Sequence, residues 1–360
     1  MGTRELPAQI LTLRAGGLGW GRAGAGAGAE LELELGLGSR NALMTENLAR
    51  RIAEAEARIR PHVRETPVAQ SLALSDVVGA DVWLKCENLQ VTGSFKVRGA
   101  TNRLLTLPDA ARRRGVVAAS SGNHGIAVSH AGRASGMAVT VYVPEGASPA
   151  KIAAMRRLGA SVVLHGTDGL DTEVEARRIA ASEGRAYVSP YNDLEVVAGQ
   201  GTVGVELRRQ LEGIDAVVVA VGGGGLISGI AAELKRHDPK VRIIGAQPAN
   251  SRVMAESVRA GQVVDIPSLP TLSDGTAGGI EADTITFPFG RTLVDEWVEV
   301  EEPAIARGMR HAVEVEHMLV EGSAGLAIAA LSGTRRPLHG RVVVVLCGAN
   351  ISAARLREVL

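Results

Sequence analysis

The sequence has few aromatic residues and very few cysteines. Aromatic side chains make up 2% of the 360 residues, as three Phe, three Tyr and three Trp. The two cysteines, Cys86 and Cys347, match neither a disulfide framework nor the spacing of zinc ligands. Both thiols are therefore expected to stay reduced, and we predict a cytoplasmic location.

The sequence also has no excess of charge and no long apolar run. Lys+Arg and Asp+Glu both number 39, which gives no reason to expect nucleic acid or a membrane surface as a partner. No apolar run approaches the roughly 18 to 20 residues of a transmembrane helix. The length of 360 residues and the 44 glycines suit an α/β enzyme of two domains.

Residues 1–43 differ in composition from the rest of the chain. Residues 14–30 are almost entirely Gly, Ala and Arg, and no continuous apolar segment of the kind found in secretory signals is present. We predict that residues 1–43 are disordered or reflect an over-long gene start, in which case Met44 is a plausible beginning.

A regular alternation of helical and strand-like segments follows. Leu48, Ile52 and Ile59 recur at helical spacing, and continuous apolar runs such as residues 342–345 are typical of parallel sheets buried on both faces. The predicted strands cover residues 80–86, 115–119, 139–143, 161–164, 186–188, 216–221, 241–246 and 342–346. The predicted helices cover residues 46–60, 97–107, 126–134, 149–158, 171–183, 200–211, 226–235, 303–320 and 323–330. This pattern predicts an α/β fold of mainly parallel sheets flanked by helices.

Lys96 is the first candidate for chemistry. The residue types at positions 92–94 predict a loop, so Lys96 falls in the first turn of the helix over residues 97–107. The positive end of a helix dipole lowers the pKa of an amine there, as a lysine that attacks carbonyl groups requires. The scarce aromatic Phe95 beside it favours a flat ligand, although an ordinary surface lysine is the simpler alternative.

Gly222, Gly223, Gly224 and Gly225 join a predicted strand to a predicted helix. Glycine lets backbone N–H groups approach a phosphate closely, and the helix N-terminus favours the anion. A tight turn is the alternative. Neither the Lys-Ser/Thr of an ATP-binding loop nor the third glycine of a dinucleotide site is present, so we predict the phosphate of another cofactor.

The run Ser120, Ser121, Gly122, Asn123 and His124 follows another predicted strand. Its hydroxyls, its carboxamide and the amides of the next helix are groups that hold a carboxylate. Helix capping by Ser and Asn is the alternative, and it accounts for few of these residues.

Ligands of parallel sheets bind beyond the carboxyl ends of the strands, where these segments are expected to meet. Cys347 also ends a predicted strand there, although packing is the usual role of a buried thiol. A nucleophilic lysine, a flat aromatic, a phosphate loop and a carboxylate loop together indicate pyridoxal phosphate acting on an amino acid.

From about residue 49 onward the chain resembles the fold-type II pyridoxal-phosphate enzymes, in the threonine/serine dehydratase and serine racemase branch. The motifs at residues 92–100, 120–125, 222–225 and 347–350 carry this resemblance in the family's order. It implies a tryptophan synthase β-like fold with a large domain (residues 44–114 and 193–360) and a small mobile domain (residues 115–192). It also implies a homodimer, and a catalytic fold that uses the chain to its end without a regulatory domain.

The resemblance assigns cofactor-binding roles to residues of three motifs. Lys96 would bind the cofactor covalently and serve as the base at Cα, and Phe95 would pack beside the ring. Asn123 would donate to the phenolic oxygen of the ring, and Cys347 would face its pyridine nitrogen. The amides of Gly222, Gly223, Gly224, Gly225 and Leu226 would bind the phosphate.

The resemblance also suggests the substrate site. Ser120, Ser121, Gly122 and His124 would hold the substrate carboxylate or lie close to it, and Ser121 is the candidate acid/base on the opposite face. The glycine-rich loop at residues 274–279 is expected to border this pocket. No metal site is expected, because Gln247 and Val253 stand where the racemases have carboxylates.

The predicted reaction is β-elimination of L-threonine or L-serine to a 2-oxo acid and ammonia. Serine racemisation is the main competing reaction, and 3-phenylserine or 3-hydroxyaspartate remain open as substrates. A β-replacement synthase is a third candidate, and a pyridoxal-phosphate-binding protein without turnover is a fourth.

Overall fold

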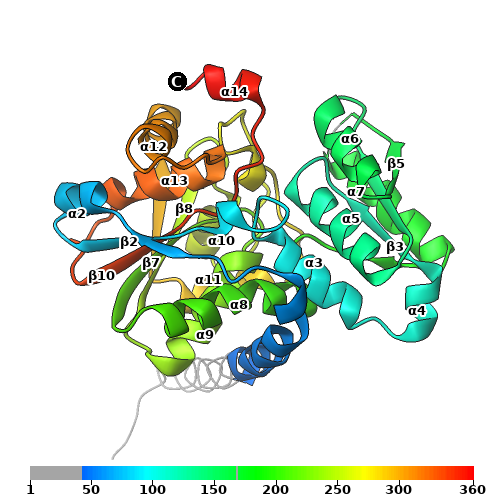
Figure 1. Cartoon of the computed structure of the whole chain (residues 1–360), viewed down its shortest axis with the longest axis horizontal. Coiled ribbons are helices and arrows are strands. Elements are labelled where there is room, and N and C mark those ends of the chain that lie inside the picture. Colours follow the sequence, from blue (N-terminus) through cyan, green and yellow to red (C-terminus); the bar gives the residue numbers. More distant parts are fainter. Residues whose placement is uncertain (1–42, 168) are drawn as a thin grey trace, which may run out of the picture. The chain divides into compact units, whose positions relative to one another are not determined.

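The computed structural model describes residues 43–167 and 169–360, and these residues are built around two β-sheets (Figure 1). The first sheet has six strands in the order β1-β2-β10-β7-β8-β9, and the second has four in the order β5-β4-β3-β6. All neighbouring strands pair in parallel except β1, which pairs antiparallel with β2. The expected α/β fold with mainly parallel sheets is confirmed.

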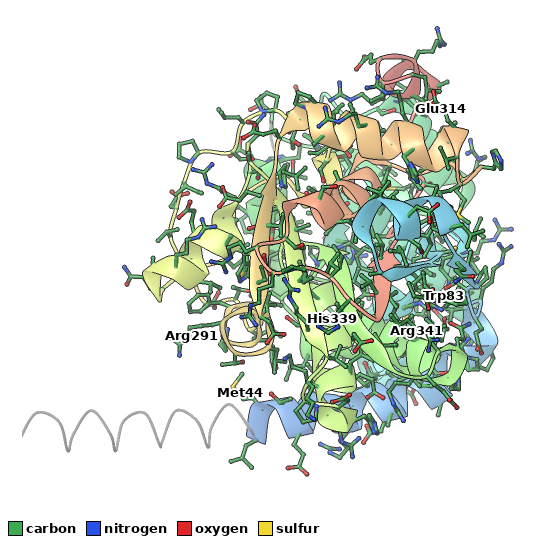
Figure 2. The ribbon with its side chains drawn as sticks, turned by 90° about the vertical axis from the view of Figure 1, so that its left-hand side faces the viewer. Met44, Trp83, Arg291, Glu314, His339 and Arg341 are labelled. Atoms are coloured by element: carbon green, nitrogen blue, oxygen red, sulfur yellow. The ribbon has the colours of Figure 1, made fainter. Side chains whose placement is uncertain are left out.

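The six-stranded sheet is buried on both faces. Val342 to Val345 have no exposed surface, which explains why this strand is apolar throughout. At one end of β10, Arg341 lies over the ring of Trp83 on β2, 5.8 Å from the ring centroid, and Figure 2 shows both side chains. The strands are β1 (Val68–Gln70), β2 (Asp81–Lys85), β7 (Ile214–Ala220), β8 (Arg242–Pro248), β9 (Glu296–Val300) and β10 (Arg341–Val345).

Helices cover both faces of this sheet. Helices α12 and α13 lie on one face, and α8 and α9 lie on the other (Figure 1). A helix over residues 43–59 comes first in the described chain, and its predicted apolar positions Leu48, Ile52 and Ile59 are fully buried. The other helices of this part are α2 (Leu72–Val78), α8 (Leu194–Gln210), α9 (Gly225–His237), α10 (Val253–Ala260), α11 (Thr286–Leu293), α12 (Glu302–Glu314), α13 (Gly322–Ala330) and α14 (Ala353–Arg357), with 3-10 turns η1 (Arg60–His62), η2 (Glu87–Leu89), η3 (Asp274–Thr276) and η4 (Leu331–Gly333).

The four-stranded sheet also has helices on both faces. Val116 and Ala118 of β3 pack in the cluster that includes α5, whereas Val117 packs with Ala176 of α7, as the twofold alternation of a strand requires. Figure 1 shows α5, α6 and α7 around these strands. The elements are α4 (Asp109–Arg114), β3 (Val116–Ala119), α5 (Asn123–Ser135), β4 (Val139–Val143), α6 (Pro149–Arg157), β5 (Ser161–Leu164), α7 (Gly169–Ser182) and β6 (Ala186–Tyr187).

Helix α3 (Lys96–Leu105) packs against both α5 and α8. A Cβ atom added at Gly199 of α8 would lie 2.6 Å from the carbonyl oxygen of Arg98, so only glycine allows this approach of the two helices. Arg98 itself has no exposed surface, and its guanidinium forms ion pairs with Glu87 at 2.7 Å and Glu206 at 2.7 Å. The start of α3, which carries Lys96, is therefore fixed to the turn η2 and to helix α8.

Several predicted boundaries need correction. The helix predicted over residues 303–320 ends at Glu314, because the backbone leaves the helix and His317 adopts a positive φ of 55°. The helix predicted from residue 200 starts at Leu194, where Asp193 accepts hydrogen bonds from the first N–H groups. Helices α2, α4, α10, α11 and α14 and strand β9 were not predicted.

The predicted two-domain division is not decided by these contacts. All strands of the second sheet fall within the expected small domain, yet residues 43–360 form one compact unit, so this division stays a prediction. The extension predicted at residues 1–43 lies outside the described residues except for Leu43. In the described ranges, no helix has both the length and the apolar character needed to cross a membrane.

Candidate active site

Four helices begin at one cavity of about 280 Å³. They are α3, α5, α9 and α13, and within the described residues none of their N-termini receives a side-chain cap. The first N–H groups of a helix have no acceptor inside the helix, and the dipole makes this end positive. The cavity therefore offers several places for an anionic group.

The structure brings every predicted site residue to the wall of this cavity. The residues from the four motifs are Phe95, Lys96, Ser120, Ser121, Gly122, Asn123, His124, Gly222, Gly223, Gly224, Gly225, Leu226 and Cys347. They come from the ends of β3, β7 and β10 and from the loop before α3. This arrangement follows from the parallel sheets, because the carboxyl ends of parallel strands meet at one edge.

Lys96 is the first residue of α3, and its amine lies against a backbone carbonyl. The Nζ atom donates to the carbonyl oxygen of Pro190 at 3.0 Å and lies 5.2 Å from the centroid of the Phe95 ring. Burial lowers the pKa of Lys96 to about 8, while nearby Cys347 and Glu321 act in the opposite direction. We expected the helix dipole to lower this pKa, whereas desolvation is the principal cause here.

Three of the four glycines of the tetraglycine each have a structural reason of their own. Gly224 has a φ of +81°, which disfavours any side chain. A Cβ atom at Gly223 would lie 2.3 Å from ring carbons of Tyr191, and one at Gly222 would lie 3.0 Å from Cα of Thr276. The loop thus combines tight packing against Tyr191 and Thr276 with the uncapped start of α9 at the cavity.

Hydrogen bonds fix both ends of the Asn123 carboxamide. Its Nδ2 donates to the Glu321 carboxylate at 2.8 and 3.0 Å, and its Oδ1 accepts from Nδ2 of Asn350 at 2.6 Å. The amide cannot flip without losing these bonds, so an N–H of Asn123 has a defined place at the cavity wall. In the same loop, Ser120 Oγ accepts from the backbone N–H of Gly122 at 3.1 Å.

His124 is a buried, neutral imidazole. Its Nε2 lies 2.8 Å from the carbonyl oxygen of Val188, which can only accept, so Nε2 carries the proton. Burial and the nearby Lys96 lower the pKa of His124 to about 3. The ring therefore contributes no positive charge near neutral pH, and its predicted closeness to a substrate carboxylate stays a prediction.

Glu321 is a wall residue that was not predicted from the sequence. It lies directly before α13, and its carboxylate also accepts from the backbone N–H of Asn350 at 3.1 Å. Burial raises the pKa of Glu321 and also keeps the Cys347 thiol protonated by raising its pKa. A carboxylate followed by the small residues of α13 was the available sequence signal.

Three further wall residues come from loops and from α6. Asp274 confirms that the glycine-rich loop borders the cavity, and it forms an ion pair with Lys151 of α6 at 3.5 Å. Tyr191 lies in the turn after β6 and had no sequence signal beyond being a scarce aromatic.

Gln247 and Val253, where no metal site is expected, are buried and make hydrogen-bond and packing contacts. Gln247 donates to the carbonyl oxygen of Val221 at 3.0 Å and accepts from the N–H of Ala255 at 2.8 Å. Val253 begins α10 and is buried. Among the residues that the structure describes, no group of three or more His, Cys, Asp and Glu side chains is arranged to hold a metal ion.

The donor set fits pyridoxal phosphate. A primary amine of low pKa is suited to a Schiff base, and the uncapped start of α9 is suited to the phosphate. A fixed carboxamide and a neutral thiol complete the wall, as ligands for a phenolic oxygen and a ring nitrogen.

Comparison with known proteins agrees with this chemistry. The sequence model of the family described as "Pyridoxal-phosphate dependent enzyme" matches residues 59–348. The L-threonine ammonia-lyase of Thermotoga maritima is 39% identical over 309 residues, which cover 86% of this chain and 77% of that protein. The catabolic L-threonine dehydratase TdcB of Escherichia coli K12 is 38% identical over 311 residues, covering 86% and 94%.

A solved structure shows the same fold. Maize serine racemase superposes with a TM-score of 0.82 at 32% sequence identity, covering 86% of this chain and 95% of that chain. The cavity residues, the two sheets and the sequence matches agree, and the chain belongs to the family of pyridoxal-phosphate dependent enzymes, with the fold-type II architecture.

Proposed function

We propose that this enzyme is an ammonia-lyase that removes the β-hydroxyl group of L-threonine, and also of L-serine. The observation that carries the proposal is the Lys96 amine, which is held at a pKa of about 8 among four helix N-termini at one cavity. The names of the relatives, an L-threonine ammonia-lyase and an L-threonine dehydratase, support this substrate class.

The proposed reaction balances without an oxidant. An α-proton and the β-hydroxyl leave together as water, and one water molecule is regained when the released product hydrolyses. L-threonine thus gives 2-oxobutanoate and ammonia, and L-serine gives pyruvate and ammonia. Pyridoxal phosphate, when bound, supplies the electron sink that makes the α-proton removable.

Lys96 is the proposed base at Cα. A pKa near 8 leaves a fraction of the amine neutral at physiological pH, which is the form that accepts a proton. After accepting the proton, the ammonium donates to the carbonyl oxygen of Pro190, the acceptor it already contacts. The carbonyl oxygen of Pro190 therefore stabilises the positive charge that Lys96 gains.

The other wall residues bind and orient the cofactor and the substrate. The starts of α9 and α5 provide N–H donors for the phosphate and for the substrate carboxylate, respectively. Asn123 presents an N–H whose direction is fixed by Glu321 and Asn350. The neutral thiol of Cys347 would face the ring nitrogen of the bound cofactor, and unlike a carboxylate it would not hold that nitrogen protonated.

Racemisation of serine is the second candidate. Ser121 lines the same cavity as Lys96, and the fold matches a serine racemase, so a second acid/base at the opposite face is chemically available. This candidate predicts D-serine in the unreacted substrate, whereas elimination alone leaves it in the L form.

The test measures 2-oxo acid release by the holoenzyme from L-threonine, L-serine, 3-phenylserine and 3-hydroxyaspartate in parallel, with chiral analysis of recovered serine. Lys96→Ala is expected to lower release at least about 1,000-fold, because the base and the cofactor anchor are both lost. Lys240→Ala, which changes an exposed lysine, is the matched control. Normal release by the Lys96 variant would overturn the proposed mechanism.

We further propose a homodimer in a reducing cytoplasm. Cys86 and Cys347 are both buried, and neither forms a disulfide within the described chain. Sedimentation of the holoenzyme as a single species of one chain's mass would contradict the dimer.

A further inference from the structure

The turn at residues 189–192 contacts two parts of the cavity wall, the Lys96 amine and the tetraglycine. Ser189 Oγ accepts from the backbone N–H of Asn192 at 2.9 Å, which closes the turn. The carbonyl oxygen of Pro190 accepts from Nζ of Lys96 at 3.0 Å. Tyr191, the next residue, lines the same cavity as Lys96.

Two contacts fix the Tyr191 ring. It packs so closely on the tetraglycine that a Cβ atom at Gly223 would lie 2.3 Å from its ring carbons. Its hydroxyl accepts from the backbone N–H of Glu281 at 3.0 Å. Burial raises the pKa of Tyr191, so the phenol stays neutral and takes no part in proton transfer near neutral pH. What Tyr191 adds to the cavity is a rigid and largely apolar ring surface.

The Tyr191 ring lines the cavity in which the substrate's β-carbon would lie. Lys96 must reach the proton on Cα, so the groups on Cβ lie within one bond of the carbon that meets the amine. The cavity wall on the α5 side is polar, with Ser120, Ser121 and Asn123. The Tyr191 ring is an aromatic surface separate from that of Phe95, which the family resemblance places beside the cofactor ring.

We propose that Tyr191 is the residue that sets the preference between L-threonine and L-serine, by packing its ring against the β-methyl group of threonine. The inference rests on the proposed function, because it assumes that the β-hydroxy amino acid binds in this cavity. Loss of contact with one methyl group changes relative specificity about tenfold or more in an apolar pocket.

The experiment compares kcat/KM for L-threonine and L-serine in wild-type, Tyr191→Phe and Tyr191→Ala holoenzymes. The phenylalanine variant keeps the ring and is expected to keep the threonine-to-serine ratio within about twofold. The alanine variant is expected to lower that ratio about tenfold. An equal loss for both substrates, with the ratio unchanged, would mean that Tyr191 has only a structural role and would overturn the inference.

A binding measurement separates this inference from the proposed function. L-2-aminobutyrate and L-alanine are threonine and serine without the hydroxyl, and their binding to the holoenzyme is followed by the visible absorbance of the cofactor. Tyr191→Ala is expected to lower the preference for L-2-aminobutyrate about tenfold, whether or not elimination occurs. If the alanine variant does not fold, Tyr191→Gln removes the ring with less loss of volume. Absence of 2-oxo acid release by the wild type would overturn the proposed function alone.

Discussion

Lys96 titrates near pH 8, whereas an ordinary lysine has a pKa of 10.5, because the protein around its amine replaces water. The folded-state pKa lies below the usual value, so the neutral amine is the favoured form above pH 8 and the ammonium dominates below it. Only the neutral amine attacks an aldehyde. The pH at which the cofactor attaches is thus a property of this cavity.

Cofactor loading should follow that titration. The rate at which apoenzyme takes up pyridoxal phosphate is expected to rise about tenfold per pH unit below pH 8 and to level off about one unit above it, because the neutral fraction of Lys96 saturates there. Visible absorbance of the bound cofactor measures this rate. A free alkylamine in the same buffers corrects for titration of the cofactor itself, and a plateau reached only near the pKa of a free lysine would contradict the burial argument.

The residues of the site differ in how well the sequence revealed them. Lys96, the tetraglycine and the loop from Ser120 to His124 directly follow strands or open helices, so local sequence places them at the sheet edge. Glu321 and Tyr191 were missed because their places depend on tertiary packing. Glu321 meets Asn123 from a position 198 residues away, and no local pattern records such a contact.

At the scale of elements, a buried charge network holds α3 in place. Arg98 joins Glu87 of η2 and Glu206 of α8, and Lys85 of β2 pairs with the same Glu206 at 2.6 Å. All of these side chains have no exposed surface. Burial of so many charges stabilises a fold only while every partner is present.

Arg98→Met is therefore expected to lower the free energy of unfolding by about 3–5 kcal/mol, because Glu87 loses its ion-pair partner within the described chain. Urea unfolding of the holoenzyme measures the loss. Arg50→Met is the matched control, since Arg50 pairs with Glu54 on the exposed face of a helix and is expected to cost less than about 1 kcal/mol. Similar losses for the two variants would show that the network is not a principal support of α3.

The elements that were predicted are those with a strong apolar pattern. The strands β3, β7 and β10 contain continuous apolar runs, whereas β9 carries Glu296 in a buried position. That carboxylate is tolerated because Arg242 pairs with it and the N–H of Arg335 donates to it at 2.6 Å. Helix α11 contains Gly290 in its interior, which lowers its helix propensity, so packing against α9 and α10 supports it.

At the scale of the whole molecule, two ion pairs connect helices α6 and α7, which pack on the four-stranded sheet, to residues 274–281 beside the cavity. Lys151 of α6 pairs with Asp274, and Arg177 of α7 pairs with Glu281 at 2.7 Å. Asp274 has a side chain that is 68% exposed, so its pair is worth at most about 1 kcal/mol. The Lys151–Asp274 contact alone would therefore not prevent the proposed movement of the small domain over the substrate.

The uncapped starts of α3, α5, α9 and α13 have a consequence for hydrogen–deuterium exchange. In the apoenzyme the start of α9 receives no side-chain cap from the described residues, so its first amides should exchange quickly. In α3 and α13 the amides of Arg98 and Ala324 already donate to the carbonyl oxygens of Phe95 and Glu321. Adding pyridoxal phosphate is expected to slow exchange at the start of α9 at least about tenfold, because a bound ligand must leave before the amides open.

Helices α2, α8 and α14 serve as internal controls in the same mass-spectrometry experiment. Ser71, Asp193 and Ser352 already accept hydrogen bonds from their first turns, so the cofactor should leave their exchange unchanged. Equal protection of all these helices would indicate general stabilisation of the fold. Selective protection at α9 would mean that the first turn of this helix is capped only when a ligand binds. The cofactor's phosphate would then serve as the helix cap that no side chain of this sequence supplies.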